Sequence, residues 1–142
     1  MTRTLRLGAM AVGIAALASP LVGAGPAAAV GNPAIVVTLP ARAELSSTGK
    51  AVRFRVAVTC SNMVPVPIDV HLAQTRSQTK VNGTGASGTT YKCNGHTQRV
   101  PVIVFANSGR FNAGGATATA SATCGSTQCA FDTRNVQLFS KS

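Results

Sequence analysis

The sequence contains very few carboxylates and very few aromatic residues. Of its 142 residues only three are Asp or Glu, aromatic residues make up 4%, and there is no tryptophan. Glycosidase-type catalysis needs a pair of carboxylates that face each other across a substrate, and only Glu44, Asp69 and Asp132 could provide it. A platform for single-stranded nucleic acid needs exposed aromatic side chains between basic residues, whereas the five phenylalanines mostly occupy core-like positions. The composition therefore argues against a glycosidase and against specific nucleic-acid binding.

Motifs of nucleophilic or metal-dependent catalysis are also missing. Asp69 and His71 lie two residues apart, so a strand would present both on its polar face, where a serine could complete a hydrolytic triad. No G-x-S-x-G motif marks such a serine. The four cysteines lack paired C-x-x-C spacings, and neither His71 nor His96 stands at a ligand offset from them. We expect no catalytic residues, no metal and no cofactor.

The one long apolar run lies near the start of the chain. Two arginines precede an apolar stretch over residues 7–22, and Ala27-Ala28-Ala29 follows it. This layout is typical of a secretory signal peptide with a small-residue cleavage site. A transmembrane anchor is the alternative, but an anchor needs about 20 predominantly apolar residues. We expect residues 1–29 to be a cleaved signal peptide and residues 30–142 to form one secreted, extracellular domain without a membrane anchor.

Positive charge dominates the expected mature domain. The whole chain has 13 Lys and Arg, and Arg3 and Arg6 leave with the signal peptide, so 13 − 2 = 11 basic residues remain against three acids, a net charge of +8. Such an excess attracts polyanions. The basic residues are scattered rather than gathered in a run, which indicates charge spread over a folded surface. A solvated basic face that keeps the protein soluble is the alternative interpretation.

Hydrophobic residues alternate with polar or small ones along most of the domain. The clearest strand is predicted over residues 51–60, where Arg53 and Arg55 occupy the polar face. The other predicted strands cover residues 34–39, 68–73, 100–106, 116–124 and 130–139. No segment has a helical period. The pattern favours an all-β fold, a single immunoglobulin-like antiparallel β-sandwich of about seven strands.

Some segments between these strands have more specific expectations. Residues 45–50 are a turn cluster, and residues 74–90 are polar and rich in Gly, Thr and Ser, as in a flexible loop or edge. One or two short strands around residues 75–81 are the alternative for the start of this second segment. Within the second segment, Asn82-Gly83 predicts a loose hairpin. In the final strand we expect Val136, Leu138 and Phe131 to point into the core.

Four cysteines allow three disulfide pairings. Cys124 and Cys129 are separated by four residues across an evident turn, so a local bond closes easily, and Cys60 is left to pair with Cys93. On the chain-entropy model the long loop contributes roughly 3.5–4 kcal/mol and the short one about 2 kcal/mol. Together these values are comparable to the whole net stability of a domain, typically about 5–15 kcal/mol.

Three segments resemble a group of small secreted actinobacterial domains: residues 93–98, residues 109–114 and residues 124–129. The resemblance implies an immunoglobulin-like sandwich and brings no activity with it. The C-x4-C turn from Cys124 to Cys129 is also similar to one in the enediyne-antibiotic apoprotein, or neocarzinostatin-like, family of secreted two-disulfide domains. This chain departs from that family because Cys60 and Cys93 are further apart than its second pair, and because the chain is basic whereas those carriers are generally acidic.

Three classes of function follow. The leading hypothesis is a non-enzymatic binding or structural module with affinity for anionic cell-surface polymers or for another extracellular protein, with Arg53 and Arg55 as the contact patch. The second is a small-molecule, chromophore-type carrier. The third is a secreted hydrolase or hydrolase inhibitor, for which Asp69 and His71 are the residues to test.

Overall fold

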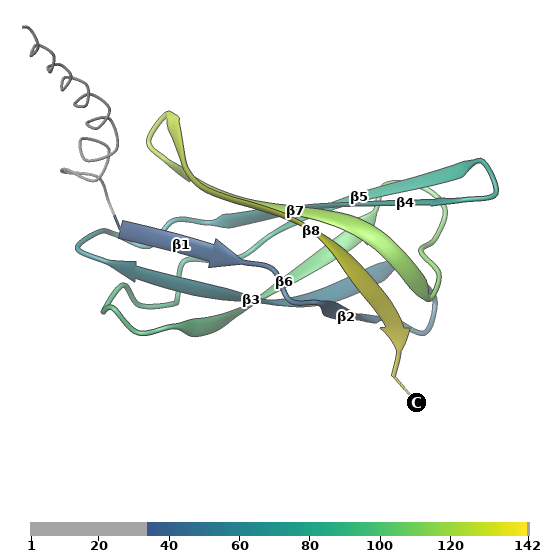
Figure 1. Ribbon diagram of the computed structural model, residues 1–142, viewed down its shortest axis with the longest axis horizontal. Coiled ribbons are helices and arrows are strands. Elements are labelled where there is room, and N and C mark those ends of the chain that lie inside the picture. The colour runs from purple at the N-terminus through teal and green to yellow at the C-terminus, as the bar shows by residue number, and fades with distance from the viewer. Residues whose placement is uncertain (1–33, 142) are drawn as a thin grey trace, which may run out of the picture. The chain divides into compact units, whose positions relative to one another are not determined.

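The computed structural model describes residues 34–141, which lie within one compact unit of the chain, and the predicted signal peptide falls outside them. Eight strands and no helix make up this described part (Figure 1). They are β1 (Ala34–Thr38), β2 (Arg42–Leu45), β3 (Ala51–Ser61), β4 (Ile68–Arg76), β5 (Thr79–Ala86), β6 (Gln98–Ala106), β7 (Gly114–Cys124) and β8 (Thr127–Ser140). The predicted all-β class is confirmed. Over the same residues there is accordingly no helix long and apolar enough to cross a membrane.

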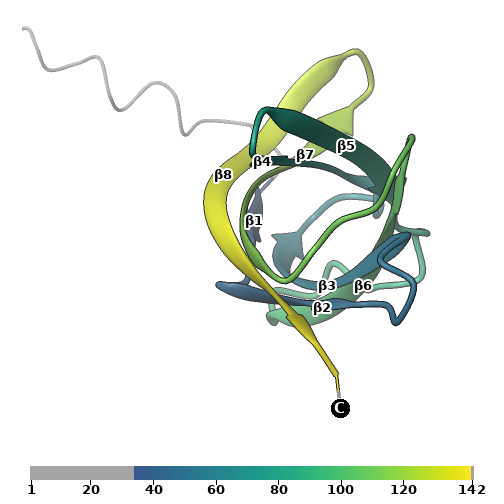
Figure 2. The ribbon, with the colours of Figure 1, turned by 90° about the vertical axis from the view of Figure 1, so that its right-hand side faces the viewer.

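Seven of the strands close into a barrel, whose ring is visible in Figure 2. One wall contains β3 and β6, paired antiparallel over eight residue pairs, and the other contains β5, β4, β7 and β8 (Figure 1). On one side β2 joins the walls, because it pairs with β3 and also runs parallel to β8. On the other side β5 meets β6 through Gly83↔Ala106 and Thr84↔Phe105. The sandwich prediction, with its separate sheets, did not include this closure.

Two glycines permit the contact between β5 and β6. A Cβ on Gly83 would lie 2.7 Å from the carbonyl oxygen of Phe105, and one on Gly85 would overlap the carbonyl oxygen of Ile103. The predicted hairpin at Asn82-Gly83 is therefore wrong, because Gly83 serves close backbone approach within a strand. The actual turn lies at Ser77 and Gln78, which adopt the positive φ angles of a two-residue hairpin, 49° and 72°.

Leu39 lies between β1 and β2, at the point where the chain changes the strands with which it pairs. β1 pairs with the far end of β3, and β2 pairs with β8. Between them, the Leu39 N–H donates to Oδ2 of Asp132 at 2.7 Å, and Nη1 of Arg134 donates to the Leu39 carbonyl at 2.7 Å. Side chains of β8 thus provide hydrogen-bond partners for the backbone of Leu39, at the point where β1 has ended its pairing with β3.

The barrel interior is filled by the inward residues of every strand, as the period of two predicts for β3. Val136 and Leu138 are buried as predicted, but Phe131 is 59% exposed. The same alternation that buries those two places Phe131 on the opposite face of β8. The expectation that the phenylalanines mostly lie in the core is also wrong, since Phe54 and Phe111 are fully buried while Phe105 is 60% exposed.

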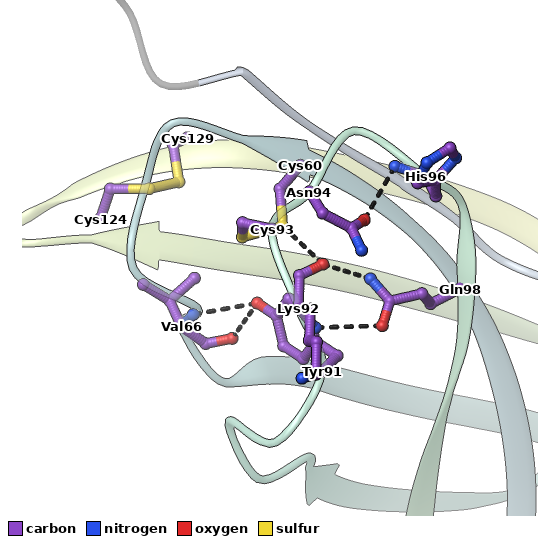
Figure 3. Close-up of a disulfide and its surroundings, with 10 residues drawn as sticks. All are labelled: Cys60, Val66, Tyr91, Lys92, Cys93, Asn94, His96, Gln98, Cys124 and Cys129. Carbon is purple, nitrogen blue, oxygen red and sulfur yellow. Dashed lines mark hydrogen bonds between the residues drawn. A yellow bond between two sulfur atoms is a disulfide. The ribbon is translucent and has the colours of Figure 1, made fainter.

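Both disulfides of the structure join the pairs that the spacing favoured, Cys60 with Cys93 and Cys124 with Cys129. The first ties the loop after β5 to the end of β3 (Figure 3). The Tyr91 hydroxyl of that loop also donates to the Val66 carbonyl and accepts from the Val66 N–H. The second disulfide closes the β7–β8 hairpin. All four cysteines of the described residues are paired, so none of these is a free thiol.

Candidate binding face

Arg53 and Arg55 project from the outer side of the barrel wall. Val52, Phe54 and Val56, which alternate with them on β3, point inward and are fully buried, so the strand directs both arginines outward. The register places Arg53 between Glu44 of β2 and Ile103 of β6. These neighbours define the surface around the predicted contact patch.

Three further cations join the two arginines on this surface. One open groove, of about 350 Å³, is lined by all five, together with Pro40, Ala43, Glu44 and Phe139. We call this surface the basic face and define it by its cations: Arg42, Arg53, Arg55, Arg99 and Lys141. Arg42 comes from β2, Arg99 from β6, and Lys141 follows β8. Residues far apart in the sequence therefore form one site.

The basic face concentrates charge. It contains five cations and one acid, a net charge of 5 − 1 = +4. Residues 34–141 contain 11 basic residues and three acids, so half of their net +8 lies in this groove. Clustered like charges repel one another, and an anion that binds among them is attracted by all of them at once.

Contacts on the basic face leave most of its positive charge uncompensated. The single ion pair within residues 34–141 joins Nζ of Lys141 to Oε2 of Glu44 at 3.8 Å, and the lysine side chain is 77% exposed. Such an exposed pair contributes little. The guanidinium of Arg42 lies over the Phe139 ring, with its carbon 4.4 Å from the ring centroid, which orients the group without neutralising it. Guanidinium groups arranged this way can bind oxyanions through paired hydrogen bonds.

The candidate hydrolytic residues lie on the other wall. Asp69 and His71 share the outer face of β4, where Asp69 is opposite Ser121 and His71 is opposite Thr119 of β7. No group of three His, Cys, Asp or Glu within residues 34–141 could hold a metal. The structure therefore places the two residues of the third hypothesis on one face of the sheet.

The three carboxylates have separate environments. Glu44 belongs to the basic face, Asp69 lies on the wall formed by β4, and Asp132 holds the Leu39 N–H. The barrel interior is occupied by side chains such as Phe54, Leu72 and Phe111. A carried small molecule, as in the second hypothesis, would therefore bind at the surface.

Comparisons with known proteins find no protein-family model and no curated protein that matches the chain. The two resemblances noted in the sequence remain predictions, and the geometry of the basic face is the basis for a functional proposal.

Proposed function

We propose that this protein is a non-enzymatic, secreted binding module whose basic face holds an anionic polymer of the cell surface. The observation that carries the proposal is the groove lined by five cations and one acid. Four of the five are arginines, the side chain best suited to phosphate, sulfate and carboxylate groups. The distribution of charge favours a binding function over catalysis.

The arrangement of the cations favours a polymer over a single small anion. Arg53 and Arg55 are two residues apart on one strand, so their Cα atoms are about 6.6–6.8 Å apart. Arg42 and Arg99 extend the cationic surface across the neighbouring strands. A chain with repeated anionic groups can contact several of these positions together and release several counterions.

Secretion is part of the same proposal. We infer that residues 1–29 are a cleaved signal peptide and that the domain works outside the cell, where disulfides form and persist. Both disulfides in the described part support this location.

We further propose that the barrel is a closed variant of an immunoglobulin-like sandwich. Two observations support this relationship: the division into two walls, and a first strand that pairs with β3 and then passes to run parallel to β8. Closure by the short contact between β5 and β6 is the variation.

The experiment measures retention of the secreted protein on immobilised dextran sulfate as salt is raised, with uncharged dextran as the blank. The variant Arg53→Gln/Arg55→Gln removes two charges from the basic face. The matched control Lys80→Gln/Lys92→Gln removes two exposed charges elsewhere. We expect the arginine variant to elute at lower salt. The plot of log affinity against log salt should also become less steep, its negative slope decreasing in magnitude by about 1.4–1.8, since each contacted phosphate-like group contributes about 0.7–0.9.

Equal losses in both double variants would mean that net charge alone, rather than the basic face, causes retention. Retention that does not weaken with salt, or no retention at all, would also contradict the proposal.

A further inference from the structure

A strip of exposed apolar side chains runs along β6 beside the basic face. Pro101, Ile103 and Phe105 alternate with buried valines and therefore project outward, with Ile103 40% and Phe105 60% exposed. We call these three residues the apolar strip. The antiparallel register places Ile103 beside Arg53 and Pro101 beside Arg55. β6 therefore presents apolar groups beyond Arg99, beside the two arginines of β3.

A second hollow connects the two surfaces. Its volume is about 280 Å³, and it shares Glu44, Arg53 and Lys141 with the groove of the basic face. It differs in containing Ile103 and Ala51, the residue that the register places beside Phe105. The outer wall therefore changes from cationic to apolar between Arg53 of β3 and Ile103 of β6. An exposed apolar patch bordered by charged groups is typical of a protein or membrane contact.

We propose that the apolar strip and the basic face dock together on the surface of an anionic lipid bilayer. The inference rests on the proposed function because it uses the same cations, and it adds a partner for the apolar side chains. A highly charged polymer would satisfy the arginines and leave Phe105 in water. A bilayer interface offers anionic headgroups and, just beneath them, an apolar layer.

The spacing of the apolar strip and the arginines fits docking at a shallow depth in the bilayer. Pro101 and Phe105 are four residues apart, so the strip extends about 13 Å along the wall. The adjacent arginines of β3 lie one strand away, about 4.8 Å to the side. Apolar groups inserted to the level of the headgroup and acyl boundary would keep these cations among the lipid phosphates.

The lack of tryptophan allows a direct test. The variant Phe105→Trp places a single tryptophan in the apolar strip, and the matched control Phe131→Trp places one on β8, where Phe131 is 59% exposed on the opposite wall. Each secreted variant is mixed with phosphatidylglycerol vesicles or with phosphatidylcholine vesicles. Mass spectrometry first verifies that residues 1–29 are absent, because their apolar run would itself bind lipid, and thermal unfolding verifies the fold.

We expect the emission of the Phe105→Trp variant to shift to shorter wavelength with phosphatidylglycerol vesicles only, and the control to show no shift. Adding Arg53→Gln/Arg55→Gln to Phe105→Trp should reduce the shift at low lipid concentration. Binding to these vesicles without a shift at position 105, or with an equal shift at position 131, would overturn the docking proposal. Retention on dextran sulfate without vesicle binding would overturn it too and leave the proposed function intact, whereas loss of both would remove both proposals.

Discussion

The carboxylate of Asp132 accepts a hydrogen bond at 2.7 Å from the backbone N–H of Leu39, 93 positions away in the sequence. Arg134 donates to the carbonyl of the same residue. The two side chains connect the end of β1 to β8 before β2 begins its parallel pairing. Asp132, which the sequence offers as a possible catalytic carboxylate, is therefore a structural residue.

Replacing Asp132 with alanine should destabilise the protein by about 1–3 kcal/mol, because a largely buried backbone donor loses its partner. Leu39 is only 1% exposed, so water cannot readily replace the carboxylate. Urea unfolding followed by circular dichroism measures the change. Asp69→Ala is the control, and we expect it to change stability by less than about 0.5 kcal/mol because the substitution breaks no buried contact. Equal losses in both variants would refute the structural role of Asp132.

Closure of the barrel should be sensitive to a single methyl group at Gly85. The variant Gly85→Ala places a Cβ against the carbonyl oxygen of Ile103, so β5 and β6 must separate. We expect a loss of at least about 2 kcal/mol, within the range for overpacked sites. The control Gly88→Ala adds a Cβ that meets no atom within 4 Å. Thermal unfolding measures the stability of both variants. Equal losses of stability would show that the contact between β5 and β6 is not tight.

The two disulfides should differ in their contribution to stability. The loop between Cys60 and Cys93 spans 33 positions and that between Cys124 and Cys129 spans 5. The chain-entropy model gives about 3.7 kcal/mol for the first and about 2 kcal/mol for the second. Guanidinium unfolding of Cys60→Ala/Cys93→Ala and Cys124→Ala/Cys129→Ala compares them. A larger loss on removing the hairpin disulfide would contradict the expected order.

Glu44 should weaken anion binding, because it is the one acid among the cations of the basic face. The variant Glu44→Gln removes its charge and frees Lys141 from the ion pair. For an exposed site we expect a gain of about 0.2–1 kcal/mol, up to about fivefold in affinity at low salt. Elution from dextran sulfate should move to higher salt. Asp69→Asn makes the same chemical change on the other wall, and an equal gain there would assign the effect to net charge.

Much of the fold is predictable because alternation is a local signal. Strand β3 was expected over residues 51–60, and its bounds in the structure are Ala51–Ser61, with Arg53 and Arg55 outward. The core positions Val136 and Leu138 follow from the same period. The same period places Phe131 outward, in agreement with its exposure and against the expectation that it lies in the core.

Other features depend on contacts between distant strands and leave no local pattern. Strand β2 is four residues long and pairs in parallel with β8, so it was not predicted. Gly83 resembles a turn residue in sequence, whereas the neighbouring strand β6 determines its role. Arg42, Arg99 and Lys141 join the contact patch only through strand order, which the alternation of residues does not encode.

The parallel pairing of β2 with β8 makes the basic face depend on the complete fold. Phe139 lies against Arg42 and Lys141 pairs with Glu44 only where β8 runs beside β2, and that pairing is one of those that close the ring. A chain in which β8 is detached would keep Arg53 and Arg55 together on β3 but would lose Lys141 from the site, and it should bind polyanions more weakly. A bound ligand, in turn, would draw together segments from both ends of the domain and raise its melting temperature in proportion to the logarithm of ligand concentration.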